Sequence, residues 1–263
     1  YYWLVRTGYP LGYPTGINTD YQLPAPELIT IAPEFDKTWN KQMTSSKTVS
    51  IDAKGDGPFT LMFSWSINHD NYGGTLMKMG DIEYGLDATS MKPYLTIGDQ
   101  TYWSQNLLGT SDAWATQSSG TDGKWYLTKL GVWNATFSYD GKTLTIYREG
   151  WIDQKFDIEG LKLDDIKIGG FDGTLVSGKV YKAALQQADI RAAISAGLLE
   201  AVTLPSETYS DIILPTSIGG KNLIWTSSNP EVISATGEIF YPKEVTEVTM
   251  TVCIGDQTKD FII

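Results

Sequence analysis

The sequence contains a single cysteine, Cys253, and a single histidine, His69, among its 263 residues. One cysteine excludes an intrachain disulfide. One histidine excludes a zinc site made of several histidines and leaves only His69 as a base for a Ser-His-Asp triad. His69 lies in the polar segment 68–71, whose Asn and Asp residues are typical of a turn. We therefore interpret it as a turn residue, with a sugar contact or a base as the alternative.

Basic residues are scarce as well. The chain has 20 Lys and Arg against 31 Asp and Glu, which gives a formal net charge of −11. Binding to nucleic-acid phosphates needs a basic patch, and the sequence has no basic run that could form one. It also has no apolar run long enough to span a bilayer. We therefore expect no nucleic-acid partner and no membrane insertion.

What the sequence does contain is a series of short strand patterns. Residues 59–67 place apolar side chains at every second position, which is typical of a β-strand. Asp140-Gly141 separates two further runs and predicts a hairpin. Residues 189–196 have helical spacing, and Gly197 is the expected stop. Other predicted strands cover residues 75–79, 130–138, 143–147, 166–168, 179–181, 223–227, 231–234, 245–254 and 259–263.

These patterns predict an all-β fold, a jelly-roll β-sandwich with one short helix, followed by a small Ig-like β-sandwich. Residues 1–27 are rich in Tyr, Pro and Gly, and we interpret them as an N-terminal connecting segment. Near residue 203 the composition changes, and the predicted strands become short and rich in Ser and Thr. The expected organisation is therefore 1–27, a jelly roll over 28–202, and an Ig-like module over 203–263.

Two stretches carry a resemblance to a known family. The first joins GKW at 123–125 to DGKTLTIY at 140–147, and the second joins IGGFDG at 168–173 to VYKAALQQADI at 180–190. Over roughly residues 28–200 the chain resembles the laminin-G-like (concanavalin-A-like lectin/glucanase) jelly rolls. It departs from their pattern at Arg148-Glu149-Gly150, where Asp-Gly is usual, and at Tyr126, where His is frequent.

The C-terminal part carries a second resemblance. The strings TLPS at 203–206, IWTSSNPEVIS at 224–234 and TGEI at 236–239 are similar to the atrophied Ig-like modules of bacteria. Such modules occur in secreted bacterial polysaccharide-degrading enzymes. The resemblance implies an extracellular, accessory region of a larger glycoside hydrolase, with a covalently attached neighbour domain and a polysaccharide or oligosaccharide as the partner.

The sequence lacks the pattern that would make this region an enzyme itself. Jelly-roll glucanases of the laminarinase type carry Glu-x-Asp-x-x-Glu on one strand, where alternation lets the carboxylates flank one glycosidic bond. The pairs Asp81/Glu83 and Asp153/Asp157 lack the rest of that pattern. We interpret them as surface charge and predict that this chain is not an enzyme.

Aromatic residues are the candidates for carbohydrate binding. Trp103 and Trp114, with Tyr102 and Asn106, lie in a polar stretch without a strand pattern, where an indole could stack on a sugar and an amide could bind hydroxyls. The alternative is that they pack under a loop. The tryptophans in strand patterns are expected in the core, namely Trp65, Trp125, Trp133 and Trp225.

Calcium is the cofactor that the sequence could hold, since it binds carboxylate and carbonyl oxygens. Asp172, in Phe171-Asp172-Gly173, is the first candidate ligand and Asp70 the second. A plain turn role for Asp172 is the alternative.

Three functions remain open from the sequence. The chain is expected to be a non-catalytic carbohydrate-binding or accessory region of a secreted, cell-surface or periplasmic bacterial protein. The alternatives are a structural spacer that positions a catalytic domain, and a glycoside hydrolase in its own right.

Overall fold

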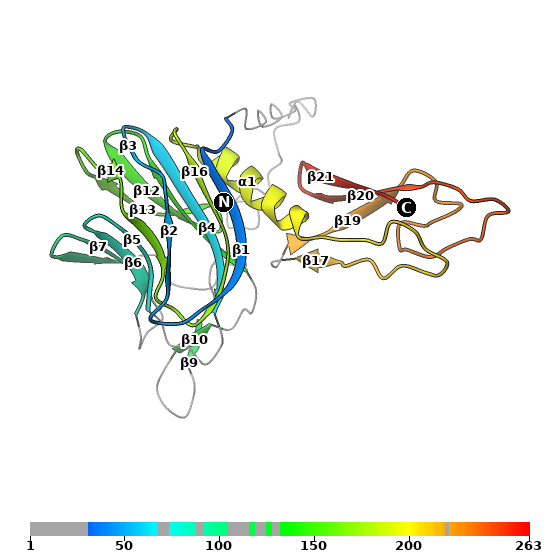
Figure 1. The fold of residues 1–263 in the computed structure, drawn as a ribbon, viewed down its shortest axis with the longest axis horizontal. Helices are drawn as coiled ribbons and strands as arrows, with labels where there is room; N and C mark the ends of the chain where they lie inside the picture. The colour runs from blue at the N-terminus through cyan, green and yellow to red at the C-terminus, as the bar shows by residue number, and fades with distance from the viewer. Residues whose placement is uncertain are drawn as a thin grey trace, which may run out of the picture.

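The computed structural model describes residues 31–67, 74–87, 92–104, 116–118, 125–127, 132–218 and 221–263. Within these ranges the chain forms two six-stranded antiparallel sheets packed face to face, one helix and a set of small C-terminal sheets (Figure 1). The predicted all-β, jelly-roll architecture is confirmed. The predicted connecting segment 1–27 lies outside the described residues.

Sheet A has the strand order β1-β16-β4-β11-β12-β13. Its strands are β1 (Phe35–Met43), β16 (Gly173–Tyr181), β4 (Phe59–Ile67), β11 (Trp133–Tyr139), β12 (Thr143–Arg148) and β13 (Trp151–Asp157). Strand β4 matches the predicted run 59–67. The apolar residues at every second position of this strand, Phe59, Leu61, Phe63 and Trp65, all lie in the core, as the alternation predicts.

Sheet B has the strand order β2-β15-β5-β6-β7-β8. Its strands are β2 (Thr48–Ile51), β15 (Ile166–Gly169), β5 (Gly74–Met79), β6 (Ile82–Leu86), β7 (Pro93–Ile97) and β8 (Gln100–Trp103). The two sheets share one core, in which Tyr84 of sheet B meets Phe137 of sheet A edge to face, with ring centroids 5.0 Å apart. Large rings from both inner faces therefore hold the sandwich together.

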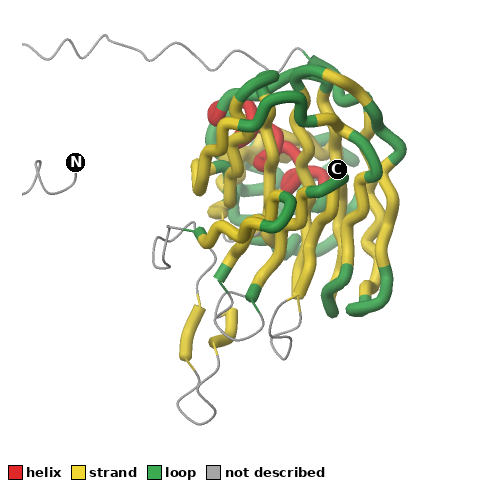
Figure 2. The backbone as a smooth tube through the Cα atoms, turned by 90° about the vertical axis from the view of Figure 1, so that its left-hand side faces the viewer, coloured by secondary structure: helices red, strands yellow, loops and turns green. Residues whose placement is uncertain are grey.

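Two short strand pairs accompany the sandwich. Strands β3 (Gly55–Asp56) and β14 (Lys162–Leu163) pair with each other, as do β9 (Thr116–Ser118) and β10 (Trp125–Leu127). Figure 2 shows β9 and β10 beyond one end of the sandwich.

The predicted hairpin at Asp140-Gly141 is confirmed, because β11 and β12 pair and Asp140 Oδ1 accepts backbone N–H bonds from Lys142 and Thr143.

Helix α1 (Gln187–Glu200) is longer than the sequence predicts. The expected stop at Gly197 is wrong, since the helix continues for three more residues. Leu198 and Leu199, directly after the glycine, are buried in a hydrophobic cluster. Burial of two leucine side chains outweighs the helix-propensity cost of one glycine, which is about 1 kcal/mol.

The start of the helix is fixed to the outer face of sheet A by buried hydroxyl groups. Thr60 Oγ1 donates to the carbonyl oxygen of Ala183 (2.7 Å) and accepts from the N–H of Leu185 (2.9 Å). Ser138 Oγ donates to the carbonyl oxygen of Leu185 (3.0 Å). The segment before α1 is thus anchored to β4 and β11, and the helix then covers this face.

The C-terminal strands form separate small sheets: β17 (Ser217–Ile218) with β18 (Lys221–Asn222), and β19 (Ile224–Ser227), β20 (Thr249–Ile254) and β21 (Gln257–Ile262) in the order β19-β20-β21. The predicted strand 231–234 is wrong. Only an isolated bridge between Ile233 and Ile239 occurs there. One hydrophobic cluster runs from Met62 on sheet A through Ile194 of α1 to Val252 of β20, so this part packs directly against the helix.

The tryptophans expected in the core are buried where the structure describes them. Trp65, Trp133 and Trp225 are each less than a tenth exposed, and the prediction is confirmed for these three. The side chain of Trp125 lies outside the described residues.

Candidate functional site

The outer face of sheet B, turned away from the core, gathers polar and aromatic side chains. Helix α1 packs on sheet A and the C-terminal strands pack on the helix, and Figure 1 shows sheet B on the opposite side of the sandwich. Alternation along the strands sends one set of side chains into the core and the other outward. Strand pairing then aligns the outward side chains in two rows across the sheet.

The first row, called here the polar row, crosses all six strands. Its members stand opposite one another in consecutive strand pairs, in the order Ser50, Lys167, Lys78, Glu83, Thr96 and Thr101. The second row, the aromatic row, lies beside it and consists of Thr75, Gly85, Tyr94 and Trp103.

Glu83 connects the two rows. Its Oε1 accepts hydrogen bonds from Tyr94 Oη (2.8 Å) and Thr75 Oγ1 (2.9 Å). Its Oε2 lies 2.7 Å from Lys78 Nζ. Three donors converge on one carboxylate, two from β5 and one from β7, so the orientation of the Tyr94 ring is fixed by the sheet itself.

These contacts set the ionisation of both groups. Partial burial acts to raise the pKa of Glu83, but the hydrogen bonds from Lys78, Tyr94 and Thr75 outweigh it and hold the pKa below its usual value. Burial, followed by the hydrogen bond to Glu83, raises the pKa of Tyr94 to about 12. At neutral pH the site therefore presents an ionised carboxylate and a neutral phenol.

Tyr94 and Trp103 form the aromatic end of this face. Their ring centroids lie 5.9 Å apart at 60°. A Cβ atom on Gly85 would lie 2.7 Å from Tyr94 Oη and 2.8 Å from Cζ, so only glycine lets the tyrosine ring lie across β6. Trp103 is 42% exposed, and its indole is therefore accessible to a ligand beside an ordered tyrosine.

The structure corrects the expected setting of Trp103 and separates it from Tyr102. The sequence predicts a polar loop around Trp103, whereas the residue ends the edge strand β8. Tyr102, as its neighbour in a strand, points to the other side, where its ring meets Phe156 of β13 edge to face at 4.9 Å. The tyrosine covers the open edge between the two sheets. The other predicted sugar-contacting residues, Asn106 and Trp114, lie outside the described residues, as does His69.

The edge strand β8 is held in place by a buried ion pair. Arg148 Nη2 lies 3.0 Å from Asp153 Oδ1, and both side chains are almost fully buried. Ser104, directly after β8, donates from its Oγ to the same carboxylate oxygen at 2.7 Å. The pair joins the end of β8 in sheet B to β12 and β13 in sheet A, close to Trp103 in sequence.

The segment Arg148-Glu149-Gly150 joins β12 to β13 through a two-residue hairpin turn. Glu149 and Gly150 have φ angles of 51° and 76°, as the two central residues of a type I′ hairpin turn require. The Glu149 carboxylate accepts hydrogen bonds from the backbone N–H and the side-chain amide of Asn134. These hydrogen bonds offset the conformational free energy that it costs to hold a glutamate in the left-handed region of backbone space.

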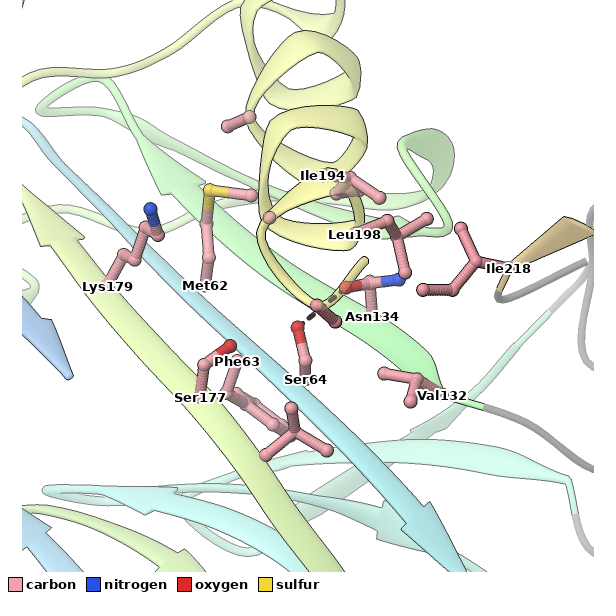
Figure 3. A pocket seen from close by; sticks show the side chains of 14 residues that line it. Met62, Phe63, Ser64, Val132, Asn134, Ser177, Lys179, Ile194, Leu198 and Ile218 are labelled. Carbon is pink, nitrogen blue, oxygen red and sulfur yellow. Dashed lines mark hydrogen bonds between the residues drawn. The ribbon is translucent and has the colours of Figure 1, made fainter. Parts of the chain in front are cut away.

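A second candidate, a pocket between sheet A and α1, is too small for a sugar. Figure 3 shows its lining by Met62, Ser64, Asn134, Ile194, Leu198 and Ile218 among others. Its volume is about 90 Å³. For comparison, a cavity that binds benzene, which is smaller than a pyranose with its hydroxyls, has a volume of about 150 Å³. The pocket is therefore a packing gap beneath the helix.

Of the two predicted calcium ligands, the structure describes only Asp172. Asp172 is exposed, and its Oδ1 accepts a hydrogen bond from the backbone N–H of Ser45 (3.0 Å). Asp70 lies outside the described residues. Within the described part of the chain, no group of three or more His, Cys, Asp or Glu side chains could hold a metal ion. Calcium binding thus stays a prediction.

Comparison with known proteins finds no matching family model and no matching curated protein. The resemblances to laminin-G-like and bacterial Ig-like modules therefore stay predictions. No described helix is long and apolar enough to cross a bilayer.

Solved structures with partial similarity exist. A candidate carbohydrate-binding protein of Bacteroides ovatus is 12% identical, with a TM-score of 0.37 over 57% of this chain and 47% of its own. The CBM40 module of Ruminococcus gnavus IT-sialidase, bound to α2,6-sialyllactose, is 13% identical, with a TM-score of 0.37 over 61% and 98%. A botulinum neurotoxin type C structure is 10% identical, with a TM-score of 0.40 over 78% and 57%. This chain thus matches less than half of the Bacteroides protein. Similarities this distant carry no functional argument. The two-sheet architecture described for this chain rests on its own strand pairing.

Proposed function

We propose that this chain is a non-catalytic carbohydrate-binding region that binds its ligand on the outer face of sheet B. The observation that carries the proposal is the exposed Trp103 beside Tyr94, whose hydroxyl is fixed by Glu83. An indole covers the apolar face of a sugar ring, while fixed hydroxyl and carboxylate groups bind its hydroxyls. Its setting would be a secreted, cell-surface or periplasmic bacterial protein that processes polysaccharides.

Binding without hydrolysis is supported by the state of Glu83. Glycosidic cleavage needs two carboxyl groups flanking the bond, one of them protonated as the acid. Glu83 is the one carboxylate in the polar and aromatic rows, and its lowered pKa keeps it ionised. The face as described therefore offers hydrogen-bond acceptors and donors but no acid–base pair.

The test compares two tryptophans of equal exposure on opposite sheets. Trp103 is 42% exposed and Trp151, on β13 of sheet A, is 43% exposed. In gel retardation with arabinan, xylan, β-glucan and galactomannan, Trp103→Ala should weaken binding roughly 5- to 150-fold, from the loss of about 1–3 kcal/mol of apolar contact. Trp151→Ala should leave binding unchanged. Binding that survives Trp103→Ala, or reducing sugar released by the purified chain, would contradict the proposal.

A spacer role is the second candidate, and one observation favours it. The hydrophobic cluster that runs from sheet A through α1 to β20 leaves the C-terminal strands no separate core in the described residues. The proposed division at residues 202/203 would then separate two modules that are held in one orientation. Binding of no glycan by the parent chain, together with intact folding, would leave the spacer as the better account.

Calcium at Asp172 is a separate proposal. If the ion binds the folded chain, millimolar calcium should raise the melting temperature by mass action, and chelation should reverse the rise. Asp172→Asn should abolish this response. A melting temperature that is the same in calcium and in chelator would remove calcium from the account.

A further inference from the structure

The polar row continues far beyond the two aromatic residues. From Thr101 on β8, two residues before Trp103, it extends over β7, β6 and β5 to Lys167 on β15 and Ser50 on β2. Strands in a sheet lie about 4.8 Å apart, so six strands span about 24 Å. The aromatic pair occupies only the last two strands, and a single sugar ring stacked on it would leave the rest of the row without a contact.

The row is polar but its charges are matched. Lys78 Nζ lies 2.7 Å from Glu83 Oε2, and Lys167 Nζ lies 3.0 Å from Asp165 Oδ1. Each ammonium group on the row therefore has a carboxylate partner. The chain as a whole carries a net charge of −11. An acidic glycan would have to displace these carboxylates and approach a negative protein, which electrostatics disfavours.

The remaining groups of the row suit neutral hydroxyls. Thr96 and Thr101 place their Oγ1 atoms 3.1 Å apart, and Ser50 and Thr101 are exposed. Hydroxyl groups donate and accept, and a paired lysine and glutamate still have unused donor protons and lone pairs. Such a surface can bind successive sugar hydroxyls without a charged partner.

From this length and this charge balance we infer that the ligand is an extended, uncharged polysaccharide chain that lies across the strands of sheet B, from Trp103 toward Lys167. The inference rests on the proposed function, because it assigns a ligand class and a direction to the same face. The aromatic end binds a chain of any length. The Lys167 end contacts only a chain long enough to reach it.

The test uses oligosaccharides of two and six residues from cellulose, xylan and arabinan, with hexagalacturonate as the acidic counterpart. Calorimetric titration of the full chain should give a hexamer affinity at least 10-fold above that of the dimer in one of the neutral series. Hexagalacturonate should bind more weakly than that hexamer. Lys167→Ala should weaken hexamer binding roughly 3- to 10-fold, the effect of losing about one hydrogen bond, and leave the dimer unchanged.

Lys162→Ala is the matched control. Lys162 is likewise an exposed lysine with a carboxylate partner, Asp56, but it lies on β14, outside sheet B. Its removal should change neither affinity, and Trp103→Ala should weaken dimer and hexamer alike.

The outcomes separate the inference from the proposed function. Equal affinity for dimer and hexamer, no effect of Lys167→Ala, or a preference for hexagalacturonate would overturn the inference. If Trp103→Ala still weakens binding in those cases, the proposed function stands. Parent chain that binds none of these sugars, nor any polysaccharide of the gel screen, would overturn both.

Discussion

The two outer faces of the sandwich are built by the same strand alternation, but one is covered by other parts of the chain and the other is accessible. On sheet A, the outward side chains Thr60, Thr136 and Ser138 are buried, and Thr60 and Ser138 bind the segment that leads into α1. On sheet B, the outward side chains Thr96, Thr101 and Trp103 stay accessible. Threonine occurs on both faces. What covers a face, and not its composition alone, decides whether a hydroxyl stabilises the fold or is available to a ligand.

The largest expected effect compares a core tryptophan with the tryptophan of the open face. Trp65 is fully buried on the inner side of β4, edge to face with Phe171 at 5.6 Å. Trp65→Ala should lower the free energy of unfolding by about 3–5 kcal/mol. Trp103→Ala should lower it by about 1 kcal/mol, since the side chain is 42% exposed and its ring contacts that of Tyr94. Urea unfolding of both variants measures the difference.

An equal loss in both variants would make Trp103 a structural residue. The open face of sheet B would then lose its binding role, and the spacer role would gain support.

A smaller effect compares threonines on the two outer faces. Thr60→Val removes the hydroxyl that binds Ala183 and Leu185 and leaves the buried N–H of Leu185 without this acceptor. The expected cost is about 1–3 kcal/mol. Thr101→Val on sheet B should change stability by no more than about 0.5 kcal/mol, because its hydroxyl is exposed. Thermal melting at one pH compares the pair, and a larger loss from Thr101→Val would reverse the assignment of covered and open faces.

The smallest effect is the pH dependence of the open face. Glu83 has a lowered pKa in the folded chain, so its contribution to stability is present above the unfolded value of about 4.3 and is lost as the pH falls through the folded value. The melting temperature of the parent should therefore exceed that of Glu83→Gln at pH 6, and the gap should close toward pH 3. A gap that stays constant over this range would show that the Lys78, Tyr94 and Thr75 contacts do not stabilise the ionised carboxylate.

Part of this site could be foreseen from the sequence and part could not. Trp103 is a candidate from the sequence because an indole among polar residues could stack on a sugar, and the structure leaves it accessible instead of packing it under a loop. Tyr94, Lys78 and Thr75 were missed, although the alternation of residues 93–97 places Tyr94 and Thr96 on one face. The sequence predicts only surface charge at Glu83, since no local pattern shows that donors from the two neighbouring strands β5 and β7 converge on it.

The sequence by itself determined strands such as β4 and β12, the hairpin at Asp140-Gly141 and the burial of Trp65, Trp133 and Trp225, because period-two alternation and turn chemistry act within a few residues of chain. Only the tertiary structure decided where α1 ends, which side of the sandwich it covers, and which side chains meet on sheet B. These features depend on strand order and register between segments as distant as Ser50 and Lys167. Local patterns carry no information on such pairing, whereas packing and hydrogen bonding in the folded chain select it.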